Sequence, residues 1–226
     1  MAEGTLGRLL GSGRTADVYE LDEAWVLRRY RDGYGDALAE GAVMAYLREH
    51  GYPAPRVRLA DSSRTDLVMQ RLPGPTMLRA LTEGALGADE AGGVLARLLR
   101  QLHGIPARRS QGSVLHLDLH PDNVILTPDG PYVIDWDNAR DGDPGLDWGS
   151  SAVILAQVAV GDDPLAEPAH ALLTALLADP SDLTEDGLAQ APRRRAENPT
   201  MSRREVELLG DAHALIRTFM REERTA

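Results

Sequence analysis

The sequence predicts an α+β protein, in which a small antiparallel sheet carrying one helix precedes a larger, mainly helical region. Three observations lead to this prediction. Short apolar runs separated by turn residues fill residues 1–71, apart from one segment with helical spacing at 36–50. Apolar residues recur at helical spacing over 89–103 and again after residue 147. Between the two regions, prolines and glycine interrupt regular structure at 72–75.

Composition limits the classes of protein to consider. A chain of 226 residues is long enough for one large or two small domains with a buried core. It contains 35 acidic and 24 basic residues, and the resulting net charge of −11 argues against nucleic acid or an anionic membrane as a partner. All 24 basic residues are arginine, so a catalytic or phosphate-binding lysine is excluded. The absence of cysteine excludes disulfides and thiolate metal sites.

A cytoplasmic location is expected. Residues 1–5 lack the basic and apolar pattern of a signal peptide, and the longest apolar run, at 152–160, is too short to span a bilayer. The acidic excess is compatible with a cationic substrate attracted over long range, and equally with a simple role in solubility. Nothing in the sequence indicates an oligomeric state.

A glycine-containing turn near the start of the chain has the spacing of a nucleotide-binding loop. Gly11, Gly13 and Val18 match G-x-G-x-x-G-x-V, although Ala16 replaces the third glycine. Glycines let the backbone approach phosphates, and an apolar residue at position 18 can cover a base. We therefore include Gly11, Ser12, Gly13 and Val18 among the expected nucleotide contacts. The pattern is weak alone, because turns with two glycines are common.

The next two elements supply a possible ion pair. Residues 24–30 are expected to form a strand that matches the V-A-I-K pattern, with Val26 over the base and Arg28 at the phosphates. A helix over 36–50 follows, and Glu40 lies beside its apolar stripe. We expect Glu40 to point inward and pair with Arg28. The alternatives are a solvated edge arginine and a surface glutamate.

The segment 115–123 carries the most specific pattern in the chain. His116-x-Asp118-x-x-x-x-Asn123 has the spacing of a kinase catalytic loop, and Asp135 follows an apolar run where a metal-binding aspartate is expected. Phosphoryl transfer depends on positioning and charge neutralisation. We expect Asp118 to accept or orient the proton of a substrate hydroxyl. Asn123 and Asp135 offer the oxygen ligands that Mg²⁺ prefers.

These segments together resemble the aminoglycoside phosphotransferase family, a branch of the protein-kinase-like fold. The family's version of the loop reads close to H-x-D-L-H-P-x-N, with I-D-W or I-D-F after it. The resemblance implies a two-lobed fold with an N-lobe over 1–71, a hinge over 72–75 and a C-lobe over 76–226. It implies a phosphotransferase that uses ATP or GTP with Mg²⁺ and acts on a hydroxyl of a small, cationic molecule. An aminoglycoside-like antibiotic, an amino sugar and an amino alcohol are candidate acceptors.

Further roles follow from the resemblance. It implies that the base of the nucleotide contacts the Gln70 C=O and the Leu72 N–H, with Met69 lining the back of the pocket. It also implies that Asp147 braces the catalytic loop or caps the next helix. Only eleven residues separate Asp135 from Asp147, which leaves no room for the long activation loop of a protein kinase.

Two alternative functions remain open. Arg28 stands where the family has lysine and exchanges a compact ammonium for a planar fork, so one alternative is a degenerate kinase-like protein that binds nucleotide without efficient transfer. The other is a metallohydrolase built on His116, Asp118 and His120, although the remaining histidines lack ligand spacing.

The remaining elements are expected from local patterns. Strands are predicted at 56–59 and 67–70, a strand pair at 123–126 and 132–135, and helices around 152–155, 172–177 and 206–219. The run Arg193-Arg194-Arg195 beside Pro192 is predicted to be a solvated loop.

Overall fold

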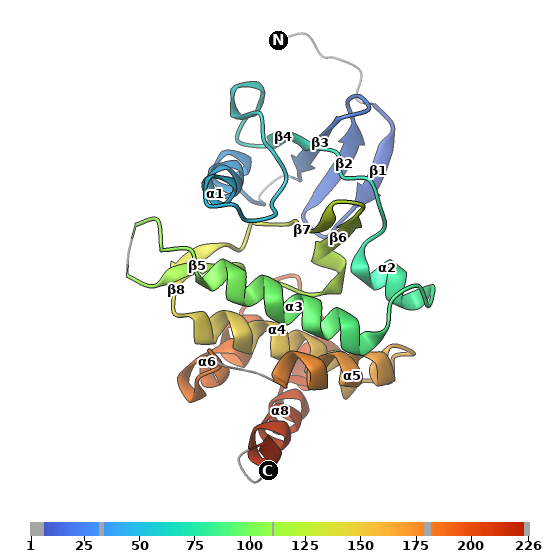
Figure 1. Ribbon diagram of the computed structural model, residues 1–226, viewed down its shortest axis with the longest axis vertical. Coiled ribbons are helices and arrows are strands. Elements are labelled where there is room, and N and C mark those ends of the chain that lie inside the picture. Colours follow the sequence, from blue (N-terminus) through green and yellow to red (C-terminus); the bar gives the residue numbers. More distant parts are fainter. Residues whose placement is uncertain (1–6, 32–33, 110, 179–181, 224–226) are drawn as a thin grey trace. The chain divides into compact units, whose positions relative to one another are not determined.

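The computed structural model describes residues 7–31, 34–109, 111–178 and 182–223 (Figure 1). The N-terminal residues 1–5, on which part of the expected location rests, lie outside the described residues. The chain forms two compact units. The first consists of Met1–Gly74 with Ile125–Ala139, and the second of Pro75–Val124 with Arg140–Ala226.

The first unit contains a four-stranded antiparallel sheet in the order β1-β2-β3-β4. Helix α1 begins after Asp36, whose side chain accepts from the N–H groups of Leu38 and Ala39, as expected for an N-cap. Its buried face includes Val43 and Met44. The bounds of these elements are β1 Leu9–Ser12, β2 Ala16–Glu20, β3 Trp25–Tyr30, α1 Ala37–Glu49 and β4 Asp66–Gln70.

A hairpin from later in the chain belongs to the same unit. It consists of β6 (Val124–Thr127) and β7 (Gly130–Val133). The Val133 N–H donates to the Pro53 carbonyl at 2.8 Å, and Trp136 packs edge-on against Tyr52 with ring centroids 5.6 Å apart. The C-lobe predicted over 76–226 included residues 125–139. They pack with the first unit because this hydrogen bond and the buried Trp136 ring attach them there.

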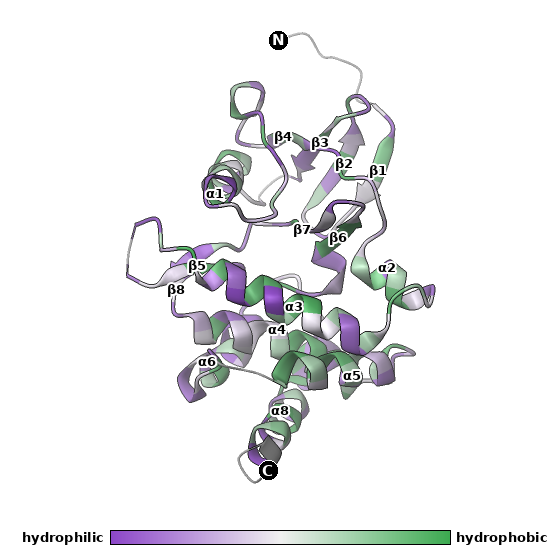
Figure 2. Cartoon of the chain, in the orientation of Figure 1, coloured by the Kyte–Doolittle hydropathy of each residue, from purple (hydrophilic) through white to green (hydrophobic). Residues whose placement is uncertain are grey.

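The second unit is mainly helical. Helix α3 packs against α5, and α4 packs against α5, α6 and α8. Helix α4 is buried on almost every side, which identifies it as the centre of this unit, and Figure 2 shows hydrophobic residues along α5. A short antiparallel pair joins β5 (Ser113–Leu115) to β8 (Arg140–Gly142). The helices are α2 Met77–Thr82, α3 Ala88–His103, α4 Pro144–Ala159, α5 Ala166–Leu177, α6 Glu185–Ala196, α7 Arg203–Glu207 and α8 Leu209–Glu223.

Three local predictions were wrong. The strand at 56–59 is reduced to one bridge between Val57 and Met69, and Leu59–Asp61 forms a 3₁₀ turn instead. Prolines at 53 and 55 cannot donate to a ladder, which limits pairing there. The single helix at 206–219 is two helices, because a capping box at Ser202 and Glu205 starts the short α7.

The third error concerns Arg193–Arg195, which lies in the last turn of α6 and not in a loop. Pro192 is inside this helix, where it removes one backbone hydrogen bond. The apolar face that α6 packs on α4, including Leu188 and Ala191, offsets that loss. Among the described residues, no helix combines the length and apolar character needed to cross a membrane.

Candidate active site

The turn between β1 and β2 is held by an arginine that sequence analysis did not identify. Arg31 donates through Nη1 to the carbonyls of Gly13, at 2.8 Å, and Arg14, at 3.0 Å, and through Nη2 to Ser12 Oγ at 2.7 Å. Gly11 has open space around the position of a Cβ. The predicted glycine loop is thus an exposed turn, with its shape fixed by a cation at its base.

Arg28 lies on β3, buried, and forms the expected ion pair with Glu40 of α1. The distance from Arg28 Nε to Glu40 Oε2 is 3.4 Å. The carboxylate of Glu40 also accepts from the Tyr30 hydroxyl at 2.8 Å and from the Trp136 backbone N–H at 3.1 Å. Burial raises the pKa of Tyr30, so its hydroxyl remains protonated as a donor. Glu40 therefore holds three elements of the first unit together.

Arg28 also contacts the predicted metal ligand. Its Nη2 donates to Asp135 Oδ1 in a very short hydrogen bond and lies 4.0 Å from Asp137 Oδ2. Burial alone would lower the pKa of Arg28, but Glu40 and Asp135 raise it above the ordinary value, so the guanidinium stays charged. The planar fork thus spans Glu40 and Asp135, which a lysine ammonium cannot do in the same way.

Asp135 has a left-handed backbone, with φ of 66°. Non-glycine residues adopt this conformation rarely, and aspartate tolerates it better than most because its short side chain bonds locally. Conformations of this kind persist where the surrounding structure fixes them, and they concentrate at functional sites. The side chain of Asp135 is 30% exposed.

In the second unit, Asp147 braces the loop that follows β5. Its buried carboxylate accepts from the backbone N–H groups of His116, at 2.8 Å, and Leu117, at 2.7 Å, and it lies 3.0 Å from His103 Nε2. Leu117 has φ of 67° and so shares the left-handed conformation of Asp135. Burial alone would raise the pKa of Asp147, but the hydrogen bonds from His103 and the backbone hold it below its ordinary value.

This braced loop presents Asp118 with its side chain 31% exposed. Asn123 donates through Nδ2 to the Asp118 carbonyl at 2.9 Å and reaches Asp118 Oδ2 at 3.5 Å. His116 Nδ1 accepts from the Asp118 N–H at 3.2 Å, so His116 supports the backbone of the loop. Asp118 is thereby fixed at its backbone while its carboxylate remains accessible.

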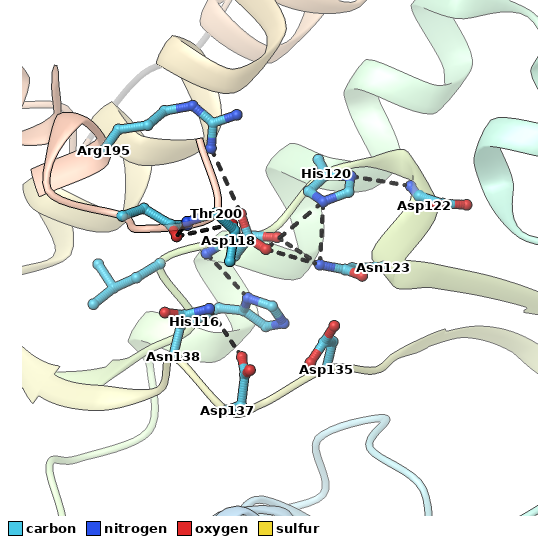
Figure 3. A network of polar contacts seen from close by, with 12 residues as sticks. His116, Asp118, His120, Asp122, Asn123, Asp135, Asp137, Asn138, Arg195 and Thr200 are labelled. Carbon is cyan, nitrogen blue, oxygen red and sulfur yellow. Dashed lines mark hydrogen bonds and ion pairs between the residues drawn. The ribbon is translucent and has the colours of Figure 1, made fainter. Parts of the chain in front are cut away.

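The structure supplies a reason for His120, whose chemical need the sequence did not reveal. Its Nδ1 accepts from the Asp122 N–H at 3.3 Å and so caps the 3₁₀ turn Pro121–Asn123. Its Nε2 lies 3.3 Å from Asn123 Nδ2 and 3.8 Å from Asp118 Oδ2 (Figure 3). Burial lowers the pKa of His120, which favours the neutral ring.

Arg195 is a further residue beside Asp118 that sequence analysis missed. The distance from its Nη1 to Asp118 Oδ1 is 3.8 Å (Figure 3). Its Nε donates to Gln157 Oε1 of α4 in a very short hydrogen bond, and Gln157 donates in turn to the Glu205 carbonyl at 2.6 Å. No sequence motif marks Arg195, because its approach to Asp118 depends on how α6 packs against α4.

The predicted metal ligands have suitable chemistry. Asn123 uses its Nδ2 in hydrogen bonds, and no partner for its Oδ1 occurs within the described residues. Asp135 keeps Oδ2 outside its bond to Arg28. Taken separately, an amide oxygen and a carboxylate oxygen are each of the kind that Mg²⁺ accepts as a ligand. Nowhere in 7–31, 34–109, 111–178 or 182–223 do three or more His, Cys, Asp or Glu gather as metal ligands, so the metallohydrolase lacks a ligand set.

The predicted base contacts surround one end of the first sheet. Val26 pairs with Met69 across β3 and β4, and both are buried. Gln70 uses its side-chain oxygen to accept from Arg56, at 3.3 Å from both the backbone N and Nε. The Leu72 N–H has no hydrogen-bond partner in the described part of the chain. The backbone of the predicted hinge can therefore still donate to a ligand.

Sequence comparison relates the chain to known phosphotransferase and kinase sequences. A sequence model described as "Phosphotransferase enzyme family" matches residues 7–113 and 106–191. Over 84 residues, the chain is 37% identical to a protein described as "Probable serine/threonine-protein kinase PkwA" from Thermomonospora curvata. That match covers 37% of this chain and spans only 11% of the other protein's length.

Solved structures share the fold over most of the chain. The complex of streptomycin, ATP and APH(2″)-IIa is 14% identical, with a TM-score of 0.56 and 92% of each chain covered. ADP-bound aminoglycoside phosphotransferase APH(2″)-Ib is 15% identical, with a TM-score of 0.56 and coverage of 94% and 95%. The complex of gentamicin and APH(2″)-IIa is 15% identical, with a TM-score of 0.57 and coverage of 92% and 90%. At these identities the similarity establishes a two-lobed, kinase-like fold.

Proposed function

Because the chain belongs to the phosphotransferase enzyme family, we propose that it transfers the γ-phosphoryl group of ATP or GTP to a hydroxyl of a small molecule. The observation that carries this proposal is the loop after β5. There Asp147 binds two consecutive backbone N–H groups, and the loop presents Asp118 partly exposed with Asn123 hydrogen-bonded to it. A fixed carboxylate with access to solvent is suited to receive a substrate hydroxyl.

Each group has a proposed task. The hydroxyl of the acceptor donates its hydrogen bond to the Asp118 carboxylate, which orients it and takes its proton as the phosphoryl group transfers. Arg28, held by Glu40, contacts the phosphates of the nucleotide. Asn123 Oδ1 and the Asp135 carboxylate would hold Mg²⁺, which neutralises charge on the phosphates when bound.

The nucleotide base is proposed to bind against the first sheet. Val18 and Val26 would cover one face of the base, and Met69 would line the back of the pocket. The Leu72 N–H, which has no partner among the described residues, supports a hydrogen bond to the base at this position. The Gln70 carbonyl is its proposed companion, and the backbone of the turn that Gly11, Ser12 and Gly13 form would approach the phosphates.

The charge of the acceptor is open to test. The net charge of −11 favours a cationic molecule by long-range attraction. However, several acidic residues in the C-terminal part of the chain have other contacts. Asp162 pairs with Arg204, Glu207 pairs with Arg203, and Glu205 caps α7. If steering matters, kcat/KM for an amine acceptor should fall as salt shortens the Debye length from about 10 Å to about 3 Å.

A degenerate, nucleotide-binding protein is the second candidate, and one contact favours it. Arg28 already occupies Oδ1 of Asp135, so a cation of the chain itself sits where the metal would bind. Nucleotide affinity should then be the same with Mg²⁺ and with a chelator. A phosphotransferase would bind the Mg²⁺ complex more tightly.

The test combines binding and turnover. We would measure the affinity for ATP and GTP by calorimetry, with Mg²⁺ and with EDTA, and then ADP or GDP release against hydroxylated acceptors with amine, acid and neutral groups. Mg²⁺-dependent affinity together with acceptor-dependent release supports the transferase. Equal affinity in both buffers, without release for any acceptor, would favour the degenerate protein.

A further inference from the structure

We propose that Arg31 is a positioning residue for nucleotide binding, because it holds the turn between β1 and β2 so that two backbone N–H groups point toward the phosphates. This inference rests on the proposed function, in which the turn receives the phosphates of ATP or GTP. It deepens that function by naming the two donors, the N–H groups of Arg14 and Thr15, and the side chain that directs them.

Arg31 directly follows β3, and its guanidinium contacts the turn at four atoms. Its Nη1 donates to the Gly13 carbonyl at 2.8 Å and to the Arg14 carbonyl at 3.0 Å. Its Nη2 donates to Ser12 Oγ at 2.7 Å and to Asp17 Oδ1 at 2.6 Å. One planar group thus binds two consecutive carbonyls, which fixes the orientation of both peptide units.

The direction of these carbonyls determines the direction of the neighbouring N–H groups. In a trans peptide, the C=O of one residue and the N–H of the next point to opposite sides, and the described residues contain no cis peptide bond. Because the Gly13 and Arg14 carbonyls point toward Arg31, the N–H groups of Arg14 and Thr15 point away from it. These two residues form the tip of the turn, since the Gly13 N–H donates across it to the Ala16 carbonyl at 2.8 Å. Successive backbone N–H groups directed to one side are suited to bind an anion.

The strand pairing shows on which face of the sheet Arg31 lies. Across β2 and β3, Asp17 pairs with Arg29, and the side chains of paired residues share a face. The next pair, Val18 and Arg28, therefore lies on the opposite face. Arg31 binds the Asp17 carboxylate, so its guanidinium is on the face opposite Arg28. The N–H groups that point away from Arg31 consequently point toward the face of Arg28 and Val18, where the nucleotide is proposed to bind.

Asp17 offsets the charge of Arg31. Its carboxylate also accepts from Ser12 Oγ at 2.6 Å. The hydrogen bonds from Ser12 and Arg31 lower the pKa of Asp17, so the carboxylate is ionised at neutral pH. A cation that is paired with a carboxylate on the far face acts on the phosphates through the shape of the turn, and not through an ion pair of its own.

Holding the turn before the ligand arrives should strengthen binding. The turn is exposed and contains Gly11 and Gly13, which lose more conformational freedom than other residues when they become ordered. A turn that must become ordered during binding reduces the affinity by that entropy loss. Arg31 keeps the turn ordered in the free protein, so its contribution should appear only with ligands that carry phosphates.

The first experiment examines the turn without nucleotide. Hydrogen exchange of the Gly13 amide, followed by NMR, would be compared in the wild type, Arg31→Ala and Arg29→Ala. The Gly13 N–H donates across the tip, so its exchange rate reports how often the turn opens. Arg29 is the matched control, because it lies on the same face and pairs with Asp66 of β4. We expect Arg31→Ala to speed this exchange about fivefold or more, and Arg29→Ala to leave it unchanged.

The second experiment separates the phosphates from the base. Calorimetry would compare ATP or GTP, whichever the wild type binds more tightly, with the corresponding nucleoside. Arg31→Ala should weaken triphosphate binding about tenfold or more, which corresponds to about 1.4 kcal/mol, and change nucleoside binding less than about twofold. Arg29→Ala should leave the ratio of the two affinities unchanged. Arg31→Lys keeps the charge without the planar fork and should still bind the triphosphate about threefold or more weakly than the wild type.

The outcomes separate this inference from the proposed function. A wild type that binds neither ATP nor GTP would contradict the proposed function itself. Tight triphosphate binding that is the same in Arg31→Ala would overturn only the role of Arg31, and so would an equal loss of triphosphate and nucleoside affinity. Wild-type affinity in Arg31→Lys, or equal losses in Arg31→Ala and Arg29→Ala, would show that positive charge acts there and not the shape of the turn.

Discussion

Arg28 donates to Asp135, 107 positions later in the chain, so the basic residue of β3 and the predicted metal ligand are joined directly. Arg28 also pairs with Glu40 at 3.4 Å, and its guanidinium therefore links two carboxylates. The absence of lysine gives this contact its importance. A planar fork can engage two acceptors at once, whereas an ammonium is a single compact charge.

Arg28→Lys should lower the Mg²⁺ concentration at which nucleotide affinity is half-maximal, by about threefold or more. The shorter cation can keep its pair with Glu40 but no longer spans to Asp135, which frees a carboxylate oxygen for the metal. Titration of Mg²⁺ at a fixed ATP concentration measures this half-maximal Mg²⁺ concentration. Arg29→Lys is the matched control, because Arg29 neighbours Arg28 on β3 and pairs with Asp66. An unchanged Mg²⁺ requirement would show that Arg28 does not compete with the metal.

Arg28→Ala should raise the KM for ATP and reduce turnover. This variant removes the cation altogether and leaves the buried Glu40 without its charged partner. The same change should lower the free energy of unfolding by about 3–5 kcal/mol, as breaking a buried ion pair does. Steady-state kinetics and urea denaturation give the two readouts. A variant as stable and as active as the wild type contradicts the assignment.

Asp118→Asn should lower turnover by about 10²–10⁴-fold while nucleotide affinity stays nearly constant, because a proton acceptor acts in the transition state. Asn123→Ala and Asp135→Asn should differ from it. The first removes an amide oxygen and the second a carboxylate charge from the proposed metal site, so both should weaken Mg²⁺-dependent nucleotide binding as well. Calorimetry with and without Mg²⁺ separates the two patterns. Asp129→Asn, on the exposed hairpin turn, is the control. Near-full activity of the Asp118→Asn variant would show that Asp118 is not the proton acceptor.

Asp147→Asn should destabilise the protein at neutral pH by about 1–3 kcal/mol. An amide has one acceptor oxygen, whereas both carboxylate oxygens of Asp147 are engaged, by the loop N–H groups of His116 and Leu117 and by His103 of α3. The pKa of Asp147 is lowered on folding, so its contribution is fully present above its ordinary value of 3.8 and declines as the pH falls through the folded-state value. The stability difference between variant and wild type should therefore shrink in strongly acidic solution. Urea denaturation of both proteins from neutral to strongly acidic pH measures this difference. Asp162→Asn is the control, because the Asp162 side chain is 97% exposed. A difference that is constant with pH would show that the carboxylate charge is not involved.

The parts of the candidate site that lie within short sequence motifs could be predicted from the sequence. The spacing of Asp118 and Asn123 is local, and the 3₁₀ turn within the loop brings Asn123 Nδ2 to 2.9 Å from the Asp118 carbonyl oxygen. The Arg28 and Glu40 pair was also predictable, because strand alternation and the apolar stripe of α1 fix where both side chains point.

Contacts that depend on packing between distant elements could not be predicted. Arg195 approaches Asp118 only because α6 rests closely on α4, and no periodicity reports a crossing of two helices. The left-handed backbone at Leu117 and Asp135 was equally hidden, since leucine and aspartate carry no signal for it comparable to glycine. The helical Arg193–Arg195 run was obscured by Pro192, which ordinarily ends a helix but is tolerated here.

The bond between Glu40 and the Trp136 N–H has a consequence for control of activity. In signalling enzymes with related helices, an off state can be reached by swinging the helix outward and separating its glutamate from the basic strand. Here the same movement would break the contacts of Glu40 with Arg28, Tyr30 and Trp136 at once. It would leave two buried charges unpaired, at a cost of several kcal/mol. Outward movement of α1 is therefore strongly disfavoured in this protein, and Glu40 holds the helix against β3 whether or not a ligand is bound.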